Sequence, residues 1–225
     1  MTGNSPKYYE AYEERYKTAH AKGVSWMSGQ KTPIVEEILQ KYRIQKDGKL
    51  LEIGCGEGRD AGPLLEKGYD LLAADISGEA IAYCKKAMPA WSGHFVVMDC
   101  LADESNRSFD FIYSVAVIHM LVHEEDRRGF YRFIERHLKP GGLTLICTMG
   151  DGIHEMQTDT DRAFDLQERD HPSGKMKVAS TSCRMVSFET FRRELTANGF
   201  LIIETGITEA LPDFDSLMYA VAGRK

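Results

Sequence analysis

The sequence predicts an α/β fold in which seven strands form a mostly parallel sheet with helices on both faces. From residue 50 onward, short apolar runs that end at glycine or aspartate alternate with amphipathic stretches. Buried parallel strands have this length, and strands that alternate with helices form parallel sheets. Five of the strands are expected at 50–53, 69–74, 95–98, 109–117 and 143–148. Two more, 200–205 and 216–222, are joined by a short polar link, which indicates an antiparallel hairpin at the end of the sheet.

Capping residues mark the helices between these strands. Thr32-Pro33 is expected to open the first helix, since threonine caps helices and proline suits their first turn. Ser77 is expected to cap a helix that runs through Lys86, and Ser187 one over 188–197. A helix over 124–138 should end at Lys139-Pro140-Gly141-Gly142, because proline and glycine stop helices.

The composition excludes several classes of protein. Of 225 residues, 43% are apolar and 28% are charged, as in folded soluble proteins, so a disordered chain is excluded. The longest apolar stretch, 111–122, is too short and too polar to span a bilayer, and no secretory signal pattern is visible. Five widely spaced cysteines without a C-x-x-C pair argue against a zinc site or disulfides. We therefore expect reduced thiols and a cytoplasmic protein.

The charge balance favours a small-molecule partner. The chain has 28 basic and 34 acidic side chains, a formal net charge of −6, and its basic residues are scattered among acids. Proteins that bind nucleic acid usually carry a basic excess or a basic stripe. We therefore expect neither a nucleic-acid partner nor a metal centre, and the oligomeric state stays open.

Two segments do not follow the alternation of strands and helices in what is expected to be a single domain over 1–225. Residues 1–30 carry Tyr8, Tyr12 and Tyr16 at a spacing that places three rings on one helix face. Residues 149–186 form a polar insertion. We expect both to cover a pocket at the strand ends, the first as a helical lid and the second on the substrate side.

The sharpest local signal is a strand that runs into the glycine bend of residues 54–58, Gly-Cys-Gly-Glu-Gly. A dinucleotide-binding loop would have its third glycine where Arg59 stands. Glu57 lies where a pyrophosphate would rest and disfavours an anion there. Asp75 and Asp99 end the next two strands, where carboxylates can bind ribose hydroxyls and an adenine amino group. The ligand is then a nucleoside without phosphate, which describes S-adenosylmethionine.

Five ordered segments carry a family resemblance: LLEIGCGEGRD, LLAADIS, VVMDCLAD, FDFIYSVAVIHML and LKPGGLTLI. The chain resembles class I S-adenosylmethionine-dependent methyltransferases over about residues 49–148, and F-x-x-E-L-x-x-x-G-F extends the likeness towards the carboxyl terminus. Within that family it is similar to the small-molecule enzymes, including the tellurite and thiopurine types. The resemblance implies a Rossmann-like fold and in-line methyl transfer to a small acceptor, with S-adenosylhomocysteine as product.

The resemblance also implies which residues bind the cofactor. The methionine part is expected to lie against Glu52, Gly54, Cys55 and Gly56, the ribose at Asp75 with Ile76 against the adenine, and the adenine edge at Asp99 and Cys100. Ser114 would offer its backbone carbonyl to the amino group of the cofactor. Tyr16 and Trp26 are candidates to lie near its carboxylate, or only to pack against the first helix.

Two residues are candidates to act on the acceptor. His119 follows the fourth strand and is the candidate general base, since imidazole accepts protons near pH 7; the alternative is a packed histidine. Arg184 precedes the Ser187 helix and could bind an oxyanion of the acceptor. The sequence leaves open a non-catalytic cofactor-binding protein. A nicotinamide-dependent oxidoreductase is disfavoured by the missing third glycine and by Glu57.

Overall fold

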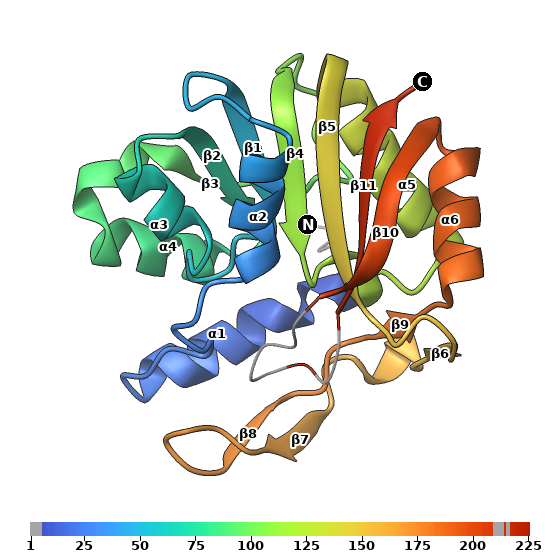
Figure 1. Cartoon of the computed structure of the whole chain (residues 1–225). Coiled ribbons are helices and arrows are strands. Elements are labelled where there is room, and N and C mark those ends of the chain that lie inside the picture. Colours follow the sequence, from blue (N-terminus) through green and yellow to red (C-terminus); the bar gives the residue numbers. More distant parts are fainter. Residues whose placement is uncertain (1–5, 209–213, 215–216) are drawn as a thin grey trace.

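A computed structural model describes residues 6–208, 214 and 217–225, and within them the chain forms a seven-stranded sheet (Figure 1). Its strand order is β10-β11-β5-β4-β1-β2-β3. The strands are β1 (Lys49–Ile53), β2 (Asp70–Asp75), β3 (Phe95–Val97), β4 (Phe109–Val115), β5 (Leu138–Met149), β10 (Phe200–Thr208) and β11 (Leu217–Arg224). Strands β1 to β5 pair in parallel, whereas β11 runs antiparallel to both β5 and β10. The predicted fold class and hairpin are confirmed; Ser216 lies outside the described residues.

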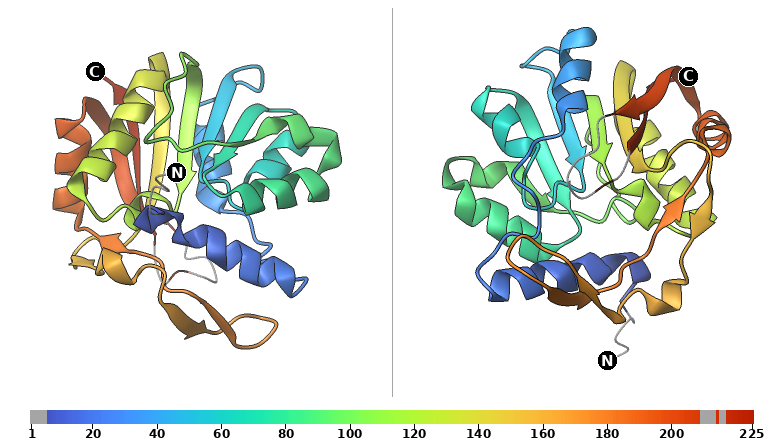
Figure 2. Two further views of the ribbon diagram at one scale, coloured as in Figure 1. Left: turned by 180° about the vertical axis from the view of Figure 1, so that it is seen from behind. Right: turned by 60° about the horizontal axis from the view of Figure 1, so that its bottom comes forward.

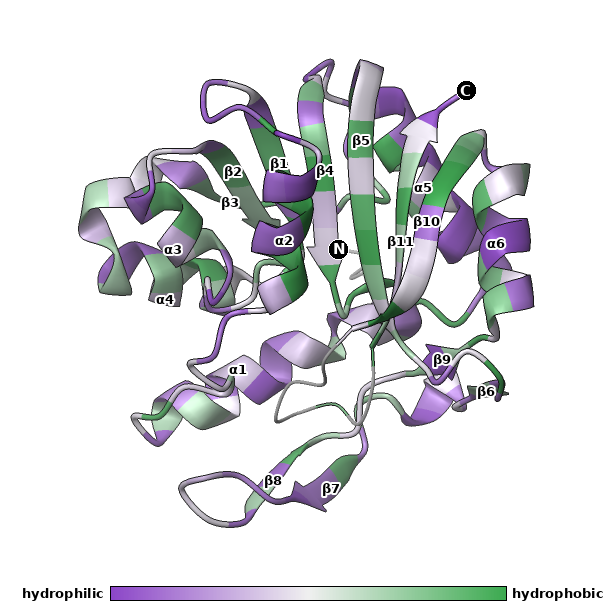
Figure 3. Ribbon diagram, viewed as in Figure 1, coloured by the Kyte–Doolittle hydropathy of each residue, from purple (hydrophilic) through white to green (hydrophobic). Residues whose placement is uncertain are grey.

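Helices cover both faces of the sheet because adjacent strand residues point to opposite sides. Leu50 packs with α2 (Pro33–Lys41), α3 (Ala61–Glu66) and α4 (Gly78–Ala87), and Leu51 packs with α5 (Glu124–His137) and α6 (Phe188–Ala197) on the other side. Each such buried leucine contributes about 1.5–3 kcal/mol. Figure 3 shows the strands as mostly apolar and parts of α5 and α6 as hydrophilic.

The helix caps are in part as predicted. The Ser77 hydroxyl accepts from the Ala80 N–H at 3.0 Å, and that of Ser187 from the Thr190 N–H at 3.2 Å. Thr32 precedes α2 but does not cap it with its side chain, which donates to Asp60 Oδ2 at 2.8 Å instead. Helix α5 passes directly into β5, so the predicted stop at 139–142 lies at the start of that strand and not in a loop.

The amino-terminal segment lies across the carboxyl ends of the strands (Figures 1 and 2). It begins with the 3-10 turn η1 (Tyr8–Glu10) and continues as α1 (Ala11–Ala21). Because Tyr8 lies before α1, the predicted face of three tyrosines is wrong: Tyr8 donates to Asp126 Oδ2 at 2.6 Å, whereas Tyr9 joins Tyr12 and Tyr16 at the cavity described below.

The insertion folds as two small two-stranded sheets below the main sheet, which the sequence analysis did not predict (Figure 1). Strand β6 (Met156–Gln157) pairs with β9 (Arg184–Met185), and β7 (Leu166–Arg169) pairs with β8 (Met176–Ala179). The remaining elements are the 3-10 turns η2 (Pro89–His94), η3 (Ile118–Met120) and η4 (Thr160–Arg162). None of the helices in the described part of the chain is long and apolar enough to cross a membrane.

Candidate functional site

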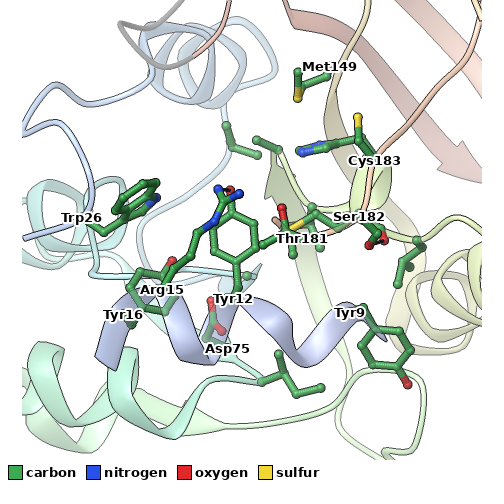
Figure 4. Close-up of a pocket in the computed structure, with 18 of the residues that line it drawn as sticks. Tyr9, Tyr12, Arg15, Tyr16, Trp26, Asp75, Met149, Thr181, Ser182 and Cys183 are labelled. Atoms are coloured by element: carbon green, nitrogen blue, oxygen red, sulfur yellow. Dashed lines mark hydrogen bonds between the residues drawn. The ribbon is translucent and has the colours of Figure 1, made fainter. Parts of the chain in front are cut away.

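A cavity of about 810 Å³ lies at the carboxyl ends of the parallel strands. Small-molecule sites usually have volumes of about 300–1,000 Å³. One wall consists of strand ends and the turns that follow them: 52–55, Arg59, Asp60, Asp75, Ile76, 98–101, 115–117, 119–121 and Met149. The opposite wall comes from the amino-terminal segment, the insertion and Phe214: Tyr9, Tyr12, Arg15, Tyr16, Trp26, Met27, Met156, Thr158, 167–170 and 180–183 (Figure 4).

The glycine bend after β1 is held by the neighbouring strand. The N–H groups of Gly54 and Cys55 donate to the Ala74 carbonyl at 2.7 and 3.0 Å. Gly54 has φ +75°, and a Cβ there would lie 2.2 Å from Val117 Cγ2, so only glycine fits. Gly56, with φ +53°, does not line the cavity, contrary to the prediction, since the Tyr16 hydroxyl occupies the space of its missing side chain.

Asp75 connects the glycine bend to α4. Its Oδ2 accepts from the Gly56 N–H and its Oδ1 from the Ser77 N–H, both at 2.8 Å. The side chain is buried but borders the cavity, and burial raises the pKa of its carboxyl although both hydrogen bonds oppose this. A carboxylate oxygen can accept more than one hydrogen bond, so Asp75 keeps acceptor capacity towards the cavity.

Asp99 already has a cationic partner from the amino-terminal segment. Its Oδ2 accepts from Lys7 Nζ at 2.8 Å and its Oδ1 from the Leu101 N–H at 2.9 Å. The bond to Asp99 raises the pKa of the Lys7 ammonium, which therefore stays charged. Burial raises the pKa of the neighbouring Cys100 thiol, so that this cavity residue is not a thiolate nucleophile.

Glu52 is a nearly fully buried carboxyl at the end of β1. Its Oε2 accepts from the Tyr113 hydroxyl at 2.9 Å. Burial, followed by the charge of nearby Asp60, raises the pKa of Glu52 to about 8. In this state the carboxyl is largely neutral at pH 7, and a positive charge in the cavity would favour its ionisation.

Glu57 anchors the amino-terminal segment and does not face the cavity. It accepts from the Trp26 N–H at 2.9 Å, the Met27 N–H at 2.8 Å and the Ser25 hydroxyl at 2.6 Å. His20 Nε2 lies 2.7 Å from its Oε1. The carboxylate lies at the bend, as predicted, and its oxygens hold residues 20–27 against that bend.

His119 lines the cavity beside the insertion and is 4% exposed. Its Nδ1 has no hydrogen-bond partner among the residues that the structure describes. Burial, and then the charges of Arg127 and Arg15, lower the pKa of His119 to about 3. The ring is thus neutral at pH 7, but the expectation of an imidazole that titrates near pH 7 is wrong, because the protonated ring would be desolvated beside two cations.

Residues 50–142 match a family model described as "Methyltransferase domain". Phosphoethanolamine N-methyltransferase 1 of Arabidopsis thaliana is 31% identical over 137 residues, which cover 59% of this chain and 27% of that protein. A probable S-adenosyl-L-methionine-dependent methyltransferase TehB of Haemophilus influenzae is 26% identical over 51% of this chain and 41% of its own length. The chain thus spans about a quarter to two fifths of these relatives.

A solved structure reproduces almost the whole architecture. The 1,6-didemethyltoxoflavin-N1-methyltransferase of Burkholderia thailandensis, solved with its substrate and S-adenosylhomocysteine, aligns with a TM-score of 0.71 at 15% identity. The alignment covers 97% of this chain and 89% of that one. The chain has the same fold as this class I methyltransferase, and residues 50–142 match the methyltransferase domain model. The Rossmann-like fold that the sequence motifs predicted is therefore confirmed, and the match to a methyltransferase domain agrees with the predicted resemblance.

The cavity contains most of the predicted site residues. Lining it are Tyr16, Trp26, Glu52, Gly54, Cys55, Asp75, Ile76, Asp99, Cys100 and His119. The structure contradicts two further predictions. Ser114 is fully buried in β4, where it pairs with Ile53 and Ile146, and the cavity begins one residue later. Arg184 lies outside the cavity and donates to the Val122 carbonyl at 2.9 Å, because β9 turns it towards the start of α5.

Arg15, a buried cation of the cavity, was not predicted from the sequence. Arg15 follows Tyr12 by three residues and precedes Tyr16, so all three lie on one face of α1. Its guanidinium lies 4.7 Å from the Tyr12 ring centre and 5.2 Å from that of Trp26 (Figure 4). An arginine on an otherwise aromatic helix face was the signal that could have revealed it.

Proposed function

We propose that this chain transfers a methyl group from S-adenosylmethionine to a small-molecule acceptor. The observation that carries the proposal is that one cavity brings together the bend at Gly54 and the carboxylates of Asp75 and Asp99. In open α/β sheets, ligands bind at the carboxyl ends of the strands, next to the point where the strand order reverses. Here that point lies between β1 and β4, beside the glycine bend.

The residues of this cavity fit a positively charged nucleoside. We propose that Asp75 accepts hydrogen bonds from the ribose hydroxyls and that Asp99 and Cys100 bind the adenine amino group, because all three residues line the cavity. Between these two carboxylates the lining is apolar, with Ile76 and Met98 for the adenine faces. We propose that Glu52 ionises when the cationic cofactor binds, and that Tyr16 and Trp26 cover its methionine end.

The chemistry that the cofactor supplies is an activated methyl group on a sulfonium sulfur. The protein then has to align the acceptor with that methyl group and to exclude water. The amino-terminal segment can do both, since Tyr12, Tyr16 and Trp26 form a large part of the wall that faces the strand ends. We propose that residues 1–30 act as a lid and 149–186 as the substrate-side wall of one domain that extends over 1–225.

His119 is proposed to contact the acceptor. Its neutral ring can accept a hydrogen bond at Nδ1 and so orient an acidic hydrogen of the acceptor. With its lowered pKa, the imidazole is too weak a base to remove a proton from the acceptor before methyl transfer begins. It could accept that proton only as the methyl group is transferred. The free cysteines and the absence of a basic stripe support a small-molecule enzyme of the cytoplasm.

Ligand-dependent stability tests the cofactor assignment. At about 100 times its dissociation constant, a ligand raises the free energy of unfolding by about 2.7 kcal/mol. S-adenosylhomocysteine should stabilise the protein to this extent and NAD should not; the reverse result would favour an oxidoreductase. Conversion of S-adenosylmethionine to S-adenosylhomocysteine with a panel of small acids, phenols, amines and thiols then separates an enzyme from a non-catalytic binding protein.

A further inference from the structure

We propose that the acceptor is an oxyanion, a small carboxylic acid or phosphate ester, and that Arg15 binds its negative charge. This inference rests on the proposed methyl transfer and names the substrate class of the same cavity. Arg15 lies on α1, is 6% exposed and lines the cavity on the wall opposite the strand ends.

The charge of Arg15 is not balanced by a carboxylate in the described part of the chain. Its Nε donates to the Ala179 carbonyl at 2.8 Å, one terminal nitrogen to the Ser180 carbonyl at 2.6 Å and the other to the Tyr12 hydroxyl at 3.2 Å. All three acceptors are neutral. A guanidinium has five N–H groups, so one N–H on each terminal nitrogen lies outside these bonds. Two such N–H groups match the two oxygens of a carboxylate or phosphate.

A second buried arginine, Arg127, shows the contrast. Arg127 is 2% exposed and makes two hydrogen bonds to the carboxylate of Glu194, at 2.9 and 2.6 Å. Burying an unpaired charge is costly, so a buried cation normally has an anionic partner in the fold. Arg15 faces a cavity instead, and a ligand anion would supply the missing partner.

The buried acidic side chains of the cavity lie on the strand-end wall, and Arg15 lies on the wall opposite them. The strand-end wall holds Glu52, Asp75 and Asp99, and its own arginine, Arg59, lies 3.4 Å from the carboxylate of Asp60. On the opposite wall the charge of Arg169, which has the same sign as that of Arg15 and belongs to an exposed residue, acts on Arg15. Glu168 and Asp170 also border the cavity, but both are exposed to solvent and Glu168 pairs with Lys175 at 2.6 Å. A cationic cofactor would thus lie near the carboxylates of the strand-end wall, and an anionic acceptor near Arg15.

The position of Arg15 favours the acceptor over the carboxylate of the cofactor itself. Its guanidinium is bonded to Ala179 and Ser180 of the insertion, and its charge acts on His119, the residue proposed to contact the acceptor. Figure 4 shows its side chain extending from α1 away from Asp75, beside the ring of Tyr12. His119, which also lines the cavity, has a buried Nδ1 atom that lacks a hydrogen-bond partner among the described residues.

The test uses the full chain loaded with S-adenosylhomocysteine, so that the carboxylate of the cofactor product is already in place. Calorimetric titration compares benzoate and inorganic phosphate with benzamide, a neutral match for benzoate. We expect the wild type to bind at least one oxyanion more tightly than benzamide. Arg15→Gln should weaken that binding about 10- to 100-fold, the range for one charged hydrogen-bonding group, and change the affinity for S-adenosylhomocysteine less than about twofold.

Two variants control for charge and folding. Lys22→Gln removes one positive charge from the exposed end of α1 and should leave oxyanion binding unchanged. Arg15→Lys keeps the charge but not the planar fork, and should weaken oxyanion binding less than Arg15→Gln. Where circular dichroism shows that Arg15→Gln does not fold, the comparison of Arg15→Lys with the wild type decides, with about a tenfold loss expected.

Three results would overturn the proposal. Equal binding of benzamide and both oxyanions would show that the cavity does not select anions. Unchanged oxyanion binding in Arg15→Gln would show that Arg15 serves only to connect α1 to β8. A loss confined to S-adenosylhomocysteine affinity would assign Arg15 to the carboxylate of the cofactor. A wild type that fails to bind S-adenosylhomocysteine would contradict the proposed function instead, and oxyanion titration of the ligand-free protein would still test Arg15.

Discussion

The two walls of the cavity are built by different forces. The strand-end wall is held by the hydrogen bonds of the parallel sheet, such as those from Gly54 and Cys55 to the Ala74 carbonyl. The opposite wall, here called the lid wall because it contains the proposed lid, is attached mainly by side chains, among them Glu57 to residues 25–27 and Arg15 to β8. Backbone ladders follow from strand pairing in any sequence of the right pattern, whereas side-chain ties depend on single residues. The first wall can thus stay common to a fold family while the second changes with the acceptor.

Removal of the lid should separate the two walls most strongly. Deleting residues 1–27 is expected to lower the rate of methyl transfer to the best acceptor of a panel at least about 100-fold, because positioning and water exclusion are lost. The sheet should stay folded, since Tyr9 is the one buried residue of this segment that belongs to either large core cluster in the described residues.

Circular dichroism and S-adenosylhomocysteine binding check this separation. A folded, truncated protein that binds the product and transfers methyl groups at the wild-type rate would show that residues 1–27 are not a lid. Loss of the folded state would show that the two walls are one cooperative unit.

The strand-end wall should respond to a single carboxylate. Asp75→Ala is expected to weaken S-adenosylhomocysteine binding about 10- to 100-fold, since it removes charged hydrogen bonds to the ribose. The matched control is Asp70→Ala, which removes an exposed carboxylate at the amino end of the same strand, outside the cavity. Calorimetric titration measures both; equal affinities for wild type and Asp75→Ala would refute the ribose assignment.

The sequence alone located the strand-end wall because its signals are local. Gly54 and Asp75 each follow a strand directly, so a parallel sheet necessarily brings them to one edge. Caps such as Ser77 and Ser187 were predictable for the same reason, since the bond spans three residues. Ser114 failed by one position, because strand ends are less certain than strand existence.

The lid wall could not be found in this way, because its contacts join distant parts of the chain. Arg15 and Ala179 are 164 residues apart, and the sequence around either residue does not indicate that the two are in contact. The anchoring role of Glu57 was likewise not predicted, because its partners, residues 20–27, lie about thirty residues earlier in the chain. Arg184 failed similarly, since its direction depends on the pairing of β9 with β6.

The pH dependence of stability and of cofactor binding tests whether Glu52, on the strand-end wall, is neutral in the free protein and ionises when the cofactor binds. With its pKa raised from 4.5 to about 8, the neutral carboxyl stabilises the ligand-free protein fully below about pH 4.5, and this contribution is lost as pH rises through about 8. The free energy of unfolding should fall by at most about 1.4 kcal/mol per pH unit in this window.

Binding should show the opposite dependence on pH. The affinity for S-adenosylmethionine should rise about tenfold between about pH 6 and pH 8, because the ionised carboxylate attracts the cation. Glu52→Gln should flatten both curves in denaturant melts and calorimetric titrations. A curve that keeps its slope in Glu52→Gln would assign the titration to another group.

His119 tests the acceptor side with a smaller effect. His119→Asn is expected to lower the transfer rate about 5- to 10-fold, as one orienting hydrogen bond is lost. Since its pKa is lowered to about 3, the stability it contributes is present above about pH 6.5 and is lost as pH falls towards 3. The rate should show no inflection from this group between about pH 6 and pH 8. The control is His154→Asn, at an exposed residue outside the cavity. An inflection in the pH dependence of the rate that His119→Asn removes and His154→Asn leaves in place would show that His119 is a general base after all.

The contact between Lys7 and Asp99 joins the two walls and should have the smallest effect. Lys7 is 44% exposed, so its ion pair is screened by solvent and is worth less than about 1 kcal/mol. If Lys7 competes with adenine for Asp99, Lys7→Ala should tighten S-adenosylhomocysteine binding about two- to threefold at low salt, and the gain should vanish as salt screens the pair. Lys22→Ala, at an exposed lysine beyond α1, should change nothing. Weaker binding in Lys7→Ala would mean that the lysine closes the lid over the bound cofactor and does not compete with it.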